Sequence, residues 1–87
     1  VTASMFCHAG HGVLHLRPFL SLSDANDVRR MERIATELYE AALDLGGIVG
    51  GEHGDGFSRT WFNRRQFGPL YDVYRETKRI FDPGNLL

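Results

Sequence analysis

Residues 5–18, MFCHAGHGVLHLRP, contain the pattern that decides the fold of the N-terminal half of the chain. A short apolar run leads into Gly10 and Gly12, and glycine permits the backbone angles that a tight turn requires. An extended pattern resumes after the glycines, with alternate residues on opposite faces of a strand. Residues 3–20 therefore predict two short strands around a glycine loop. The second strand lies at an edge or ends at Pro18, because proline has no N–H to donate to a neighbouring strand.

A helix is predicted after the hairpin, where the chain has its clearest periodicity. Ser23, Asp24 and Asn26 are candidate N-cap residues, and Gly46 with Gly47 predicts the end of the helix. The apolar positions step by three and four residues and form one stripe: Val28, Met31, Ala35, Leu38, Ala42 and Leu45.

The remaining sequence predicts a third strand and a second helical region. Residues 47–56, GIVGGEHGDG, indicate a strand that runs into a loop. A helix is expected from about residues 60–63 to Phe81, with a break at Gly68-Pro69, because proline removes a helix hydrogen bond. The order strand, strand, helix, strand, helix predicts an α+β sandwich, with helices on one face of a small antiparallel sheet.

Composition narrows the class of protein. The 87 residues have room for one small domain, and the net charge of −1 gives no electrostatic case for nucleic acid as a partner. The single cysteine, Cys7, cannot form an internal disulfide, so we expect a reducing, cytoplasmic location. Its thiol is expected to be a small buried group rather than a metal ligand, because strand alternation points it away from His8. The alternative location is at a membrane, reached through another part or partner of a parent protein. The chain lacks an initial Met and is expected to be a piece of a longer protein.

Histidine and glycine gather in the same two windows of the sequence. His8 and His15 flank the hairpin loop, and Glu52 and His53 are adjacent in the second window. If residues 47–56 are extended, Glu52 and His53 point to opposite sides, so that one can bind a metal while the other faces a different cavity. Two imidazoles and a carboxylate suit Zn²⁺ or a similar divalent ion that must also hold a substrate. The alternative is a set of polar residues packed around glycine turns.

Other polar residues near these windows also allow two interpretations. His11 lies between two glycines at the loop tip and is expected to be an exposed turn residue rather than a ligand. Arg59, Arg64 and Arg65 follow the second glycine window. They either bind a substrate carboxylate or phosphate in bidentate fashion or are solvated charges at the start of a helix.

Three motifs resemble the C-terminal domain of FAD-linked oxidases, a group that includes glycolate oxidase, D-lactate dehydrogenase and D-2-hydroxyglutarate dehydrogenase. Residues 8–15, HAGHGVLH, resemble the signature G-H-x-G-D-G-N-L-H, and residues 51–56, GEHGDG, resemble G-E-H-G-x-G. Residues 79–87, RIFDPGNLL, are similar to the K-x-x-F-D-P ending. His11 and Val13 depart from the pattern, since they stand where the family usually has Asp and Asn.

The resemblance implies that residues 1–87 are part of a single ferredoxin-like α+β cap domain. The cap lies over FAD, which is held mainly by a separate FAD-binding domain that this chain lacks. His8, His15 and Glu52 would then bind a divalent metal, often zinc, that holds the carboxylate and hydroxyl of the substrate. His53 would take the hydroxyl proton while hydride passes to FAD.

The activity implied by the resemblance is oxidation of a D-2-hydroxy acid of the lactate, glycolate or 2-hydroxyglutarate type. Arg59 and Arg64 are the candidate substrate-binding residues, and the 87 residues alone are expected to be inactive. The motifs assign no residue of the chain to FAD itself.

Two functions from other classes fit the same sequence. One is a metal-free structural cap that shields the flavin and shapes the substrate pocket. The other is a ferredoxin-like interaction module that self-associates through the sheet edge near Pro18 or through Trp61 and Phe62. A metal-dependent hydrolase is a weaker third alternative, because only Glu52 or His53 could serve as its general base.

Overall fold

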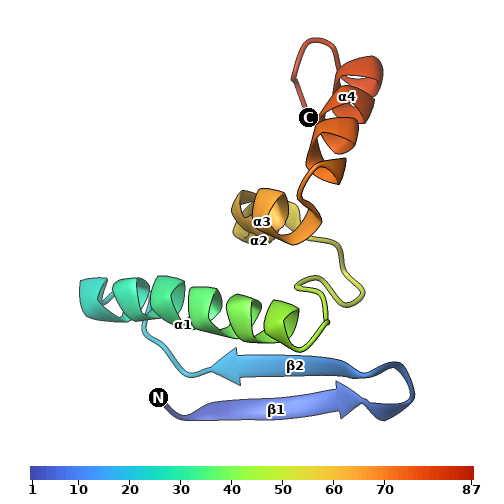
Figure 1. Ribbon diagram of the computed structural model, residues 1–87. Helices are drawn as coiled ribbons and strands as arrows, with labels where there is room; N and C mark the ends of the chain where they lie inside the picture. Colours follow the sequence, from blue (N-terminus) through green and yellow to red (C-terminus); the bar gives the residue numbers. More distant parts are fainter. The chain divides into compact units, whose positions relative to one another are not determined.

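The computed structural model describes residues 1–87, which form two compact units, 1–54 and 55–87. The mixture of a small antiparallel sheet and several helices confirms the predicted α+β class (Figure 1). None of the helices combines the length and the apolar character that crossing a membrane requires. The first unit contains β1 (Ala3–His8), β2 (Val13–Pro18) and α1 (Ala25–Asp44). The second contains α2 (Gly56–Arg59), α3 (Asn63–Phe67) and α4 (Leu70–Phe81).

The two strands form the predicted antiparallel hairpin, and β2 ends at the expected proline. A single turn of 3-10 helix, Ala9–His11, joins them, and Gly12 follows it with a φ of 67°, which glycine adopts without strain. The register places Phe6 opposite His15. Because residues two apart on a strand share a face, His8 lies on the same face as this pair. The hairpin thus brings His8 and His15 together.

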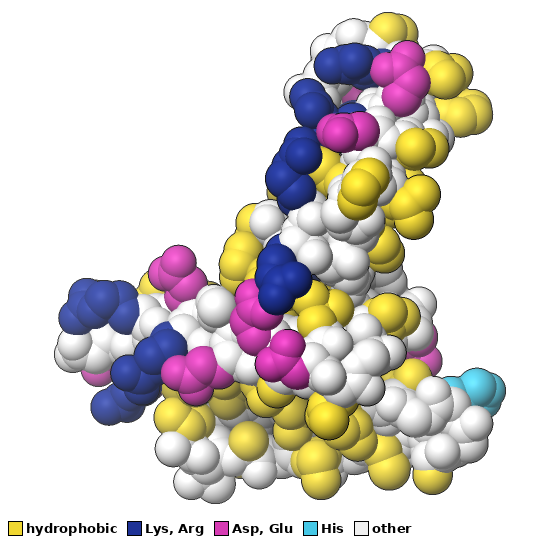
Figure 2. Space-filling view, in the orientation of Figure 1, with side chains coloured by type: hydrophobic (Ala, Val, Ile, Leu, Met, Phe, Trp, Pro, Cys, Tyr) yellow, Lys and Arg dark blue, Asp and Glu magenta, His cyan; other side chains and the backbone are white.

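Helix α1 forms where the periodicity predicts it. The side chain of Asp24 caps its first turn by accepting a hydrogen bond from the Asn26 N–H at 2.7 Å. Gly46, with a φ of 76°, follows its end. The helix runs beside the hairpin in Figure 1. The predicted stripe is only partly covered, since Ala35 is half-buried whereas Leu45 is exposed. Figure 2 shows hydrophobic side chains at the surface around the hairpin and this helix.

Two sequence predictions for the first unit are wrong. The third strand expected within residues 47–56 does not form, and residues 47–55 are an irregular loop beside a two-stranded sheet. Ile48 and Val49 are too short an apolar run to hold a strand among so many glycines, and Gly54 turns the chain with a φ of 69°. The thiol of Cys7 is exposed rather than buried, because every residue of β1 is exposed, on both faces of the strand.

The second unit is helical and breaks where the sequence predicts. Helix α3 ends before Gly68, which has a φ of 53°, and α4 begins after Pro69. Helical structure in this unit begins at Gly56, earlier than the start at residues 60–63 that the sequence predicts. Phe62 is the buried apolar residue of this unit, at 5% exposure, and the ring of Trp61 packs against it edge-on at 5.3 Å.

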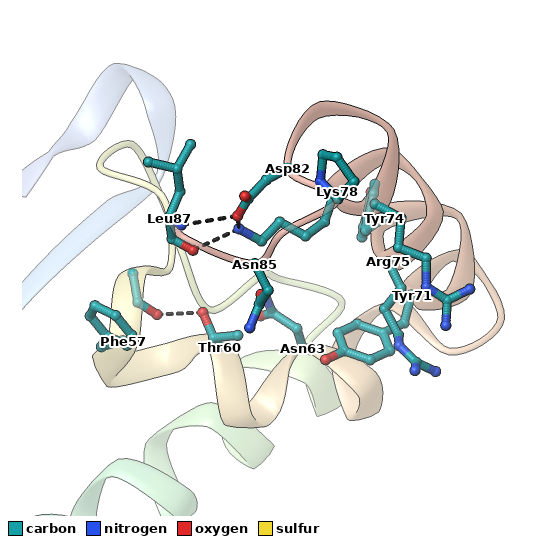
Figure 3. Close-up of a pocket in the computed structure, with 13 residues that line it drawn as sticks. Phe57, Thr60, Asn63, Tyr71, Tyr74, Arg75, Lys78, Asp82, Asn85 and Leu87 are labelled. Atoms are coloured by element: carbon teal, nitrogen blue, oxygen red, sulfur yellow. Dashed lines mark hydrogen bonds and ion pairs between the residues drawn. The ribbon is translucent and has the colours of Figure 1, made fainter.

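Asp82 fixes the end of α4 to the residues that follow it. This carboxylate is buried and accepts hydrogen bonds from the Lys78 ammonium and from the backbone N–H groups of Leu86 and Leu87. Figure 3 shows the Lys78 and Leu87 partners. These hydrogen bonds, that of Lys78 first, lower the pKa of Asp82 from its ordinary value of 3.8 to about 2.

Asp82→Asn is expected to lower the thermal unfolding temperature at neutral pH and to remove an acid-dependent contribution. Because the folded carboxyl has the lower pKa, its stabilisation is complete above about pH 4 and disappears as the pH falls through about 2. Circular dichroism melts over that pH range measure the effect. Asp72→Asn, at an exposed carboxylate that pairs with Arg64 at 3.4 Å, is the matched control. An acid profile identical in Asp82→Asn and wild type would contradict this role.

Candidate metal centre

The carboxylate of Glu52 is the meeting point of three imidazoles in the first unit. Its Oε1 lies 3.3 Å from Nε2 of His8, 3.0 Å from Nε2 of His15 and 3.2 Å from Nε2 of His53. The four side chains come from both strands of the hairpin and from the loop after α1. The sequence analysis identified all four residues as candidates, and the fold brings the three imidazoles to one oxygen atom of Glu52.

The approach of the loop to the hairpin depends on Gly51. A Cβ at this position would lie 3.0 Å from Cγ1 of Val13, which is tighter than ordinary van der Waals contact. The absent side chain lets the next two residues, Glu52 and His53, reach the hairpin face that carries the histidines. The expectation that these neighbours point to opposite sides is wrong, because it assumed an extended strand and the segment is a bend.

The donor set of His8, His15 and Glu52 fits a divalent cation. The ligand atoms of the three residues all lie within 4.8 Å of one another. Ligands about 2.1 Å from a tetrahedral ion are roughly 3.4 Å apart, so this cluster needs only a small adjustment to close on one ion. Imidazole nitrogen and carboxylate oxygen are donors that zinc accepts.

The state of His15 gives a second, independent indication of fit. Its Nε2 is buried and has no hydrogen-bond partner, although Glu52 Oε1 is only 3.0 Å away, because the two groups are not aligned for a hydrogen bond. A buried ring nitrogen without a partner is costly, and a cation would satisfy it. The side chain of His15 is 20% exposed, against 45% for His8 and 37% for Glu52. The cluster is therefore anchored at His15 and open to solvent on its other side.

The remaining predicted residues lie outside this cluster. His11 is exposed in the turn between the strands, as expected. Arg59 and Arg64 belong to the second unit, where Arg64 pairs with Asp72 and lies over the ring of Tyr71 at 4.7 Å. Neither arginine lines the cavity of about 660 Å³ that Figure 3 shows in this unit. Their role toward a substrate stays a prediction.

Sequence reasoning missed the aromatic partner of the cluster. The ring of Phe6 stacks on the imidazole of His15, with 4.3 Å between the ring centres and 9° between the planes. The guanidinium carbon of Arg17 lies 4.8 Å from the centre of the same phenyl ring. The signal was available, because strand alternation places Phe6 on the same face as His8.

The hairpin and the loop after α1 thus place three imidazoles and one carboxylate in a single cluster on an α+β fold. The sequence model of the FAD linked oxidases, C-terminal domain, matches residues 1–87, and the chain belongs to this family. This confirms the resemblance that the three motifs indicated.

Several named relatives are similar over nearly the whole chain. D-2-hydroxyglutarate dehydrogenase of Haemophilus influenzae is 40% identical over 84 residues, which are 95% of this chain and 8% of that protein. The enzyme of the same name from Escherichia coli is 38% identical over 84 residues, with the same coverage. The glycolate oxidase component GlcD of Bacillus subtilis is 31% identical over 88 residues, all of this chain and 19% of that protein. No solved structure matches. The chain thus spans less than a fifth of the length of each of these relatives.

Proposed function

We propose that this chain supplies the metal-binding, substrate-side part of a flavin-dependent enzyme that oxidises a D-2-hydroxy acid. The observation that carries the proposal is the convergence of His8, His15 and His53 on one oxygen of Glu52. Membership of the FAD linked oxidases supports FAD as the cofactor, with the FAD-binding domain of a parent protein as the partner. The names of the relatives support hydroxyglutarate, glycolate or lactate as the type of substrate.

His8, His15 and Glu52 would hold the divalent cation, with zinc as the first candidate. A bound cation supplies positive charge that attracts the substrate carboxylate and lowers the pKa of the substrate hydroxyl. The buried Nε2 of His15 would anchor the site, and the more exposed His8 and Glu52 would leave its solvent side open to the substrate. Among the three proposed ligands, Glu52 is the one with a negative charge, which would balance part of the charge of the cation.

His53 would accept the proton of the substrate hydroxyl at Nε2. Its side chain is 79% exposed and lies beside the three proposed ligands, so an incoming substrate can reach it. A neutral imidazole accepts a proton readily near neutral pH. FAD, when bound by the parent protein, would accept the hydride from C2, and loss of both the proton and the hydride would leave a 2-oxo acid. Glu52 Oε1, 3.2 Å from Nε2, would stabilise the imidazolium that forms.

Arg59 and Arg64 are proposed as further contacts for the substrate carboxylate. The planar guanidinium group matches a carboxylate in bidentate geometry. Arg64 would have to exchange its long contact with Asp72, at 3.4 Å, for the substrate. Such an exchange costs little, since both partners are exposed and exposed ion pairs contribute about 0–1 kcal/mol.

Metal content tests the proposal and separates it from a metal-free cap. After saturation with Zn²⁺ and desalting, the wild-type protein should retain about one ion per chain, measured by elemental analysis. His8→Ala should lose the ion, because one of three protein ligands is removed. His11→Ala is the matched control, since this histidine lies three residues away but outside the cluster. Equal metal content in the His8→Ala variant and wild type would reject the ligand assignment.

A further inference from the structure

We propose that Phe6 is a positioning residue, whose ring holds the imidazole of His15 in the orientation required for metal binding. The inference rests on the proposed function and names a determinant of the same site. The direct pairing of Phe6 and His15 across the hairpin sets their two side chains side by side.

The need for a positioning group follows from the torsional freedom of histidine. The outer torsion of an imidazole side chain is broad, so the backbone of β2 does not by itself fix the plane of the ring. Nε2 of His15 forms no hydrogen bond that would hold it. A second flat ring at 4.3 Å and only 9° from parallel supplies that restraint, because rotation of the imidazole would break the stacking.

The exposure of Phe6 argues against an ordinary core role. Phe6 is 43% exposed, so its ring is not enclosed in a core. The phenyl ring is itself held by Arg17, whose guanidinium lies 4.8 Å from the ring centre and adds a cation–π contact. Arg17, Phe6 and His15 thus form a stacked group on the hairpin face that carries the candidate ligands.

Phe6 contacts the two imidazoles in different ways. The imidazole of His8 stands at 82° to that of His15, with 4.9 Å between centres, and at 78° to the phenyl ring, with 6.3 Å between centres. Phe6 therefore restrains one proposed ligand directly and touches the other only at an edge. Its removal should free the orientation of His15 first.

Phe6→Leu tests the inference, because it keeps an apolar side chain and removes the flat ring. We expect the dissociation constant for Co²⁺, measured by visible absorption titration, to rise about 10- to 100-fold, the effect usual for groups that orient metal ligands. Phe6→Tyr retains the ring and should restore binding close to that of wild type. Met5→Leu, on the neighbouring residue and the opposite face of β1, is the matched control.

Proton NMR of the metal-free protein provides a readout that does not depend on metal. The ring current of Phe6 should shift the His15 ring protons upfield in wild type and in Phe6→Tyr, and this shift should disappear in Phe6→Leu. Absence of the shift in wild type would overturn the inference even if Phe6→Leu failed to fold. Co²⁺ binding by Phe6→Leu equal to wild type would overturn it while leaving the metal site intact. Failure of wild type to bind Co²⁺ would instead overturn the proposed function, and the inference with it.

Discussion

Glu52→Gln is expected to weaken divalent-metal binding by about 100-fold or more, since a ligand should cost at least as much as the groups that orient it. The reason is geometric and electrostatic. One oxygen of Glu52 lies within 3.3 Å of three imidazole nitrogens, and the amide that replaces it is neutral and a poorer donor to a cation. Isothermal titration calorimetry with Zn²⁺ measures the change.

The control for Glu52→Gln is the same substitution on α1. Glu37 is exposed and pairs loosely with Arg33 at 3.7 Å, so Glu37→Gln should leave metal affinity unchanged. Circular dichroism should show both variants folded, because neither carboxylate is buried. If Glu52→Gln bound Zn²⁺ as tightly as wild type, Glu52 could not be a metal ligand.

His53→Gln in the FAD-containing parent enzyme is expected to lower kcat by about 10²- to 10⁴-fold, the usual contribution of a positioned proton acceptor. Gln can donate or accept a hydrogen bond but cannot take up the hydroxyl proton. Because His53 lies outside the group of three proposed ligands, metal affinity should change little. Formation of the 2-oxo acid and bleaching of the flavin under single-turnover conditions measure the chemical step.

His11→Gln serves as the comparison for this second substitution. It makes the same replacement at an exposed histidine in the hairpin turn and should leave kcat unaltered. A loss of metal affinity in His53→Gln as large as the loss of kcat would make His53 a ligand and not the proton acceptor.

The elements that depend on local chemistry were predictable from the sequence. The hairpin follows from two glycines between extended segments, and α1 follows from apolar residues at intervals of three and four after a capping Asp24. The break at Gly68-Pro69 follows from the missing proline N–H and a glycine with positive φ. Each of these signals lies within a few residues of the feature that it predicts.

The features that the sequence did not predict depend on interactions between residues far apart in the chain. A third strand would need a neighbouring strand to supply its hydrogen bonds. The sequence around Ile48 and Val49 does not show whether such a neighbour exists, and the sheet has only two strands. The four site residues were identified as a set, yet their convergence on one atom depends on the bend after Gly51 and its contact with Val13. The stacking of Phe6 on His15 depends in turn on the register of the hairpin, which the turn length alone left open.

The separation of the ligands along the chain has a thermodynamic consequence. His8 and Glu52 are 44 residues apart, on either side of α1, so a cation between them would act as a cross-link that closes most of the first unit. Part of the binding free energy would then appear as folding free energy, and the melting temperature of residues 1–54 would rise with metal concentration. A chelator would behave as a denaturant of this unit.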